Sequence, residues 1–68
     1  MTIVVNGDAR ELPPGTTVRE LLDALAVEGG ASGVAIAVDA EVVPRGEWDT
    51  TELDEGARVE ILRAIQGG

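Results

Sequence analysis

Short apolar runs alternate with turn-forming residues along the first part of the chain. Residues 2–5, Thr-Ile-Val-Val, predict a strand that ends at Asn6-Gly7. This dipeptide is typical of two-residue hairpin turns, because both of its residues accept a positive φ. Residues 9–12 predict the returning strand, and the two prolines that follow end it because proline has no N–H to donate to a sheet. The chain therefore opens with a β-hairpin.

A helix follows the prolines. Thr17 is placed as its N-cap, and Glu20, three residues later, can complete a capping box. Apolar residues then recur at the i, i+3, i+4 and i+7 positions of one helical face, namely Val18, Leu21, Leu22 and Leu25. The helical run is about ten residues long, so packing against the rest of the domain must stabilise it. The glycine-rich residues 28–33 end it in a loop.

The second half of the chain predicts three more strands. Residues 34–38 form the first, residues 42–43 a short second one that Pro44 ends, and residues 58–64 the last. Residues 48–53 predict an irregular segment with room for one helical turn.

The turn between residues 38 and 42 contains an unusual residue. Ala40 stands where a tight hairpin would need a left-handed conformation, which costs alanine about 1–2 kcal/mol. We therefore expect a turn that avoids this conformation.

Five short strands and one helix predict a two-layer α+β domain, because one amphipathic helix covers one face of one sheet. The first two strands pair as a hairpin, the next two do the same, and the last strand lies beside the first at the centre. That arrangement is the β-grasp, a mixed sheet with one helix packed across one face. A ferredoxin-like fold would need a second helix, which the pattern does not contain. Residues 1–64 form this domain, and residues 65–68 form a flexible tail that ends in Gly-Gly.

Strand alternation divides the apolar residues between two faces. The larger set points toward the helix: Ile3, Val5, Val34, Ile36, Val38, Val59 and Ile61. The opposite parity leaves Val4, Ala35, Ala37 and Leu62 on the face without a helix. An apolar patch bordered by charge is typical of a docking surface. The alternative is the ordinary scatter of exposed aliphatic residues.

Composition narrows the possible chemistry. The chain has 68 residues with neither Cys nor His, so thiolate and imidazole chemistry are excluded. Thirteen acidic residues against five arginines give a net charge of −8, with no lysine. Nucleic acid is an unexpected partner, since phosphate binding needs a basic face. The acidic surface either meets a basic patch on a protein partner or only keeps the domain soluble.

Membrane and targeting signals are also missing from the pattern. No apolar run approaches the length of about 18 residues that a membrane span needs. No secretory leader precedes the first strand, so we expect a cytoplasmic protein.

The last four residues, Ile65, Gln66, Gly67 and Gly68, have no obvious sheet partner. Glycine lacks a Cβ, so a Gly-Gly end can thread a narrow channel and present its carboxylate to another protein's active site. That carboxylate could attack the α-phosphate of ATP to give an acyl-adenylate. The chain has no phosphate-binding loop and no Cys, His or Lys for this step, and its acids do not have metal-site spacing. It is therefore expected to be a substrate or carrier rather than an enzyme, with no metal site.

The whole chain resembles the small bacterial sulfur carrier proteins of the ThiS/MoaD family. The resemblance rests on "IVVNG" at 3–7, "TVRELL" at 17–22, "VVPRGEW" at 42–48, "DEGARVEI" at 54–61 and the closing "GG". The segment from Val43 to Trp48 makes it more similar to the carriers of thiamin thiazole biosynthesis than to those of molybdopterin. The Asp39-Ala40 turn departs from the Asn-Gly-like turn common in such proteins.

This resemblance implies a ubiquitin-like fold and a chemistry for the tail. Gly68 would be adenylated by a ubiquitin-activating-enzyme-like (E1-like) partner of the ThiF type, which consumes ATP, while the carrier itself binds no cofactor. Sulfur from a cysteine desulfurase would convert the adenylate to a thiocarboxylate, and a thiazole synthase of the ThiG type would take that sulfur. Arg45 either contacts a partner or is a solvated loop residue. Trp48 is expected to anchor the packing of its irregular segment.

Three other functions are compatible with the sequence. The chain could carry sulfur to a different acceptor, such as molybdopterin, cysteine or a specialised metabolite. It could modify other proteins through isopeptide bonds, as ubiquitin does. It could also be a non-covalent β-grasp interaction module whose Gly-Gly end has no role.

Overall fold

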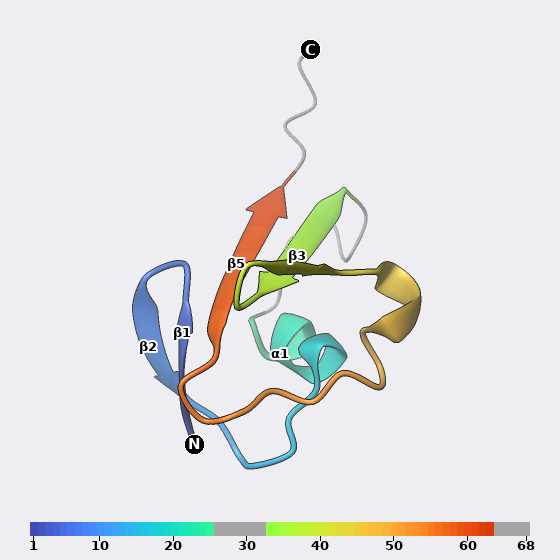
Figure 1. Ribbon diagram of the computed structural model, residues 1–68. Helices are drawn as coiled ribbons and strands as arrows, with labels where there is room; N and C mark the ends of the chain where they lie inside the picture. Colours follow the sequence, from blue (N-terminus) through green and yellow to red (C-terminus); the bar gives the residue numbers. More distant parts are fainter. Residues whose placement is uncertain (26–32, 64–68) are drawn as a thin grey trace.

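The structure is a computed structural model that describes residues 1–25 and 33–63. Within these residues, five strands form one mixed sheet in the order β2-β1-β5-β3-β4, and one α-helix packs behind it (Figure 1). The elements are β1 (Thr2–Val5), β2 (Asp8–Glu11), α1 (Val18–Ala24), β3 (Val34–Val38), β4 (Glu41–Val43), the 3-10 turn η1 (Arg45–Glu47) and β5 (Arg58–Arg63). The predicted α+β architecture of the β-grasp type is confirmed.

The central strand is β5, as the sequence predicted. It pairs in parallel with β1, through Val4↔Arg58 and Val5↔Val59, and antiparallel with the whole of β3, from Val38↔Val59 to Val34↔Arg63. Each remaining strand is the outer half of a hairpin, β2 with β1 and β4 with β3. Parallel pairing of β1 and β5 requires a crossover connection between them, and the helix lies in that connection.

The helix begins at the predicted capping box. The Glu20 backbone N–H donates to Thr17 Oγ1 at 3.2 Å, and the Thr17 N–H donates to Glu20 Oε1 at 2.9 Å. Both bonds satisfy N–H groups that the first turn of a helix leaves without an intrahelical partner. The described helix has seven residues and ends with Leu25 as C-cap, shorter than the expected run of about ten.

The core lies between the helix and the sheet and follows the predicted parity. Val18, Leu21 and Leu22 of the helix are buried, and Leu25 packs against the core from its edge. The sheet contributes Ile3, Val5, Val34, Ile36 and Val59, with Val38 and Ile61 partly buried. Burial of each such side chain contributes about 1.5–3 kcal/mol. The strand-to-face assignment from the sequence is confirmed.

Trp48 closes one end of the core. It is 1% exposed, and its indole Nε1 donates to the Val43 carbonyl at 2.9 Å. The helical turn expected within residues 48–53 begins earlier, at Arg45–Glu47, with Pro44 as its N-cap. The indole both fills the core and ties this turn to the end of β4, so the prediction that Trp48 anchors the segment is confirmed.

The turn between β3 and β4 corrects one expectation. Ala40 has a φ of 70° and Asp39 a φ of 50°, so the chain does adopt the left-handed conformation that we expected it to avoid. Asp39 holds the turn against the start of β5. Its N–H donates to the Arg58 carbonyl at 2.8 Å, and its Oδ1 accepts from the Arg58 N–H at 3.0 Å. These bonds, together with the two-residue connection, stabilise a turn that alanine alone disfavours.

Candidate functional site

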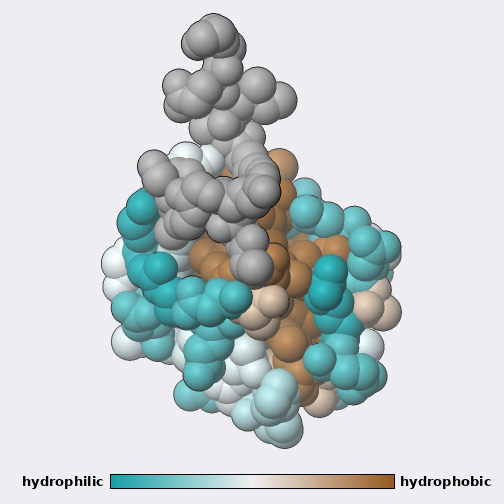
Figure 2. All heavy atoms as spheres, turned by 180° about the vertical axis from the view of Figure 1, so that it is seen from behind, coloured by the Kyte–Doolittle hydropathy of each residue, from teal (hydrophilic) through white to brown (hydrophobic). Residues whose placement is uncertain are grey.

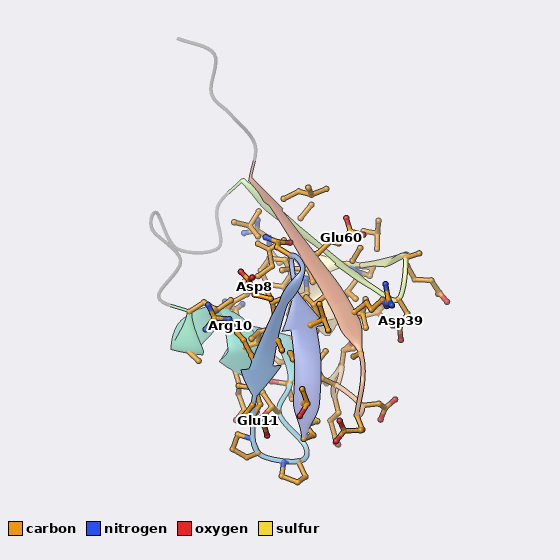
Figure 3. All side chains as sticks on the ribbon, turned by 90° about the vertical axis from the view of Figure 1, so that its left-hand side faces the viewer. Asp8, Arg10, Glu11, Asp39 and Glu60 are labelled. Atoms are coloured by element: carbon orange, nitrogen blue, oxygen red, sulfur yellow. The ribbon has the colours of Figure 1, made fainter. Side chains whose placement is uncertain are left out.

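The four residues assigned to the uncovered face lie together on three adjacent strands. Ala35 of β3 is directly opposite Leu62 of β5, and Ala37 follows two residues along β3. Val4 of β1 lies on the other side of β5. Leu62 is 60% exposed, Ala35 is exposed, and Val4 and Ala37 are half-buried. The helix packs on the far side of the sheet, so nothing within the described residues covers them (Figure 3).

Val42 belongs to the same surface, although the sequence analysis did not include it. It lies opposite Ala37 in the β3–β4 hairpin and is 74% exposed. The hairpin register would have identified it, because a two-residue turn at Asp39-Ala40 pairs residue 37 with residue 42. The five residues Val4, Ala35, Ala37, Val42 and Leu62 are called the open-face patch below.

Charged residues interrupt and border this patch. Arg58 lies opposite Val4 and Glu60 lies opposite Ala37, and both are exposed. Figure 3 shows Asp39 and Glu60 on the open side of the sheet, whereas Asp8 and Arg10 of β2 lie on the helix side. These two charges on β5 lie between Val4 of β1 and the apolar residues of β3 and β4. The continuous apolar part is therefore formed by Ala35, Ala37, Val42 and Leu62, and an apolar area bordered by charge is typical of a protein-docking surface.

The helix side of the molecule offers a different surface. Seen from behind, polar residues flank an apolar band (Figure 2). A shallow depression on this side is lined by Leu12, Pro13, Pro14, Gly15, Thr16, Glu20 and Ala24. Its one titratable side chain, Glu20, is already engaged by the capping box. This depression therefore brings together no set of catalytic groups.

Arg45 lies over the indole of Trp48, with its guanidinium carbon 5.1 Å from the ring centroid. Arg19 of the helix approaches the same ring at 5.5 Å, and its Nε contacts Asp49 Oδ1 at 3.2 Å. Cation–π contacts of this kind contribute about 0.5–1 kcal/mol at exposed sites. Arg45 thus has a packing role that the sequence analysis did not foresee, and its contact with a partner stays a prediction.

Residues Ile65, Gln66, Gly67 and Gly68 lie outside the described residues. The last described residue is Arg63 of β5, which pairs with Val34 of β3. Residues 1–25 and 33–63 contain no group of three or more His, Cys, Asp or Glu side chains that could hold a metal ion. No helix in those ranges has the length and apolar character needed to cross a membrane.

The fold and the open-face patch define the class, a ubiquitin-like β-grasp protein. Comparisons with known proteins specify the family. A model of the ThiS family matches residues 3–68. The chain is also 32% identical over 68 residues to sulfur carrier protein ThiS of Escherichia coli, with both chains covered in full.

A solved structure agrees with these sequence matches. The crystal structure of thiamine biosynthesis protein ThiS from Geobacter metallireducens is 34% identical and has a TM-score of 0.86, with both chains covered in full. The chain also matches a thiazole synthase of Paramagnetospirillum magneticum at 32% identity, covering 20% of that protein. The chain therefore belongs to the ThiS family. Its function class is that of a sulfur carrier for thiamin thiazole synthesis, as the sequence predicted.

Proposed function

We propose that Gly68 is the residue that carries the sulfur. The observation that supports this most is the family match, which extends through the closing Gly67-Gly68. An oxygen of the Gly68 carboxylate attacks the α-phosphate of ATP and releases pyrophosphate. A sulfur nucleophile then attacks the carbonyl carbon of the adenylate and displaces AMP. When that nucleophile is the persulfide of a cysteine desulfurase, the product is an acyl disulfide, and a thiol co-reactant reduces its S–S bond. Gly68 is then left as a thiocarboxylate, in which one sulfur replaces one oxygen.

The carrier relies on partners for each step. The chain has no His, Cys or Lys, so the groups that activate ATP and deliver sulfur belong to other proteins. An activating enzyme of the ThiF type consumes the ATP, and a cysteine desulfurase supplies the sulfur. The carrier itself binds no cofactor and is not an enzyme. Because activation consumes ATP, we expect the carrier to work in the cytoplasm.

Thiazole synthase is the partner that takes the sulfur. A protein named thiazole synthase contains a stretch, 20% of its length, that is similar to the whole of this chain. A single polypeptide that joins a carrier-like stretch to a thiazole synthase supports a direct functional connection between the two.

The open-face patch is where the activating enzyme docks. Its residues Ala35, Val42 and Leu62 are apolar and exposed, and β5 runs through it toward the Gly-Gly end of the sequence. Ile65, Gln66 and Gly67 then thread the partner's active-site channel, since the two glycines at the end add no side-chain bulk. Arg45, an exposed residue whose guanidinium lies over the Trp48 ring, is a second contact with the partner.

Removal of Gly68, or addition of one residue after it, tests this assignment. Either change should abolish adenylation, measured as ATP–pyrophosphate exchange with the activating enzyme, because the carboxylate is then displaced from the reacting position. The melting temperature should stay at the wild-type value, since the change lies beyond β5. Adenylation of the extended protein at the normal rate would overturn the proposal.

A further inference from the structure

Strand β5 continues beyond the end of its parallel partner. Pairing of β1 with β5 ends at Val5↔Val59, whereas β5 continues to Arg63 along β3. On the β1 side, the peptide groups of β5 after Val59 would therefore lack a strand partner. Strand β5 ends at Arg63, the last described residue, which stands five residues before Gly68 in the sequence.

The side chain of Asn6 takes the place of the missing strand. The backbone N–H of Asn6 donates to the Val59 carbonyl at 2.9 Å, and this is the last main-chain bond between the β1 hairpin and β5. Its Oδ1 then accepts from the Ile61 N–H at 2.9 Å, and its Nδ2 donates to the Ile61 carbonyl at 3.3 Å. A carboxamide has the same donor and acceptor as a peptide group. Asn6 therefore extends the ladder by one residue after its main chain has turned away.

The hairpin turn alone does not require this side chain. Asn6 and Gly7 have φ values of 49° and 88°, and a glycine at position 6 would adopt the same turn at least as readily. The turn therefore explains why residue 6 accepts a positive φ. It does not explain why both polar atoms of the carboxamide bind the backbone N–H and carbonyl of one residue, Ile61, 55 residues away in the sequence.

We propose that Asn6 is a positioning residue for the carrier reaction, an inference that rests on the function proposed above. Ile61 lies seven residues before Gly68, so the chain between them spans at most about 25 Å. A small rotation of β5 at Ile61 would thus displace the point from which the tail starts. The Gly68 carboxylate must come within about 3–3.5 Å of the α-phosphate to react. By holding Ile61 from the β1 side, Asn6 fixes the direction in which the tail enters the partner's active site.

Two neighbouring substitutions separate positioning from stability. Asn6→Gly removes both side-chain bonds to Ile61 and keeps the turn. Gly7→Ala keeps both bonds and strains the turn, because residue 7 has a φ of 88° while an added Cβ would meet nothing within 4 Å. The second variant is therefore a matched control in the same hairpin.

Hydrogen exchange first tests the contact itself. In Asn6→Gly, the Ile61 amide should exchange about fivefold faster, the equivalent of one net hydrogen bond. The Leu62 amide should keep its protection, because strand alternation turns it toward β3. Unchanged exchange at Ile61 would overturn the proposal.

Steady-state adenylation with the activating enzyme then tests the positioning. For Asn6→Gly, kcat should fall about tenfold while KM changes less than about twofold. The variant still docks on the activating enzyme through the open-face patch, but its Gly68 carboxylate is no longer held in the reacting position. For Gly7→Ala, kcat should equal the wild-type value despite a lower melting temperature. A wild-type kcat for Asn6→Gly, or equal losses in both variants, would overturn this inference alone. Failure of the wild-type protein to be adenylated would instead overturn the proposed function.

Discussion

Leu62 lies directly opposite Ala35 across the β3–β5 ladder, and both side chains are exposed on the face that the helix does not cover. The leucine side chain therefore projects beyond the alanine beside it, and a partner protein can pack against this uneven apolar surface. Leu62→Asp should therefore weaken binding to the activating enzyme about tenfold or more, because burial of a leucine is lost and a charge must be desolvated. Titration calorimetry of the two proteins measures the change.

The matched control for this variant is Ala24→Asp, which adds the same charge on the exposed part of the helix, away from the open-face patch. It should bind as the wild type does. Leu62→Asp should also keep its circular dichroism spectrum, since Leu62 is 60% exposed. Unchanged affinity for Leu62→Asp would show that the patch is not the docking surface.

Ala40→Gly should stabilise the protein by about 1 kcal/mol, because glycine adopts a φ of 70° without the steric cost that alanine incurs. In a domain of this size that gain raises the melting temperature by about 4–8 °C. The same substitution at Ala37, in the extended backbone of β3, should instead lower it. Calorimetry of both variants decides the point, and a destabilised Ala40→Gly would contradict the strain assigned to this turn.

Leu22→Ala should destabilise the domain by about 2–5 kcal/mol, since Leu22 is 4% exposed and packs between the helix and the sheet. A 68-residue domain has a total stability of about 3–10 kcal/mol, so this one change removes a large part of it. Leu62→Ala is the matched control, with an expected effect within about 0.5 kcal/mol because its side chain is exposed. Equal urea midpoints for the two variants would contradict the assignment of the core face.

Much of this fold is predictable because local signals and strand parity agree. The Asn6-Gly7 pair predicted the turn of the first hairpin, and the capping box of Thr17 and Glu20 predicted the start of the helix. Strand alternation predicted that Ile61 faces the helix and that Leu62 faces away from it. Each of these signals acts within a few residues of the chain, where geometry leaves few choices.

The features that were missed depend on contacts between distant residues. Ala40 adopts a left-handed conformation in a turn that Asp39 ties to Arg58, 19 residues away in the sequence. Val42 was overlooked because a three-residue strand has too little alternation to reveal its face. The bonds from Asn6 to Ile61 likewise require the parallel pairing of the first and last strands to be known first.

The most direct test of the account is the intact mass of the protein, with Gly68 as its C-terminal residue, after incubation with ATP, the activating enzyme and a sulfur source. We predict a gain that corresponds to one sulfur in place of one oxygen, located at Gly68 by fragmentation. An unchanged mass, with the activating enzyme shown to be competent on another carrier, would contradict the account.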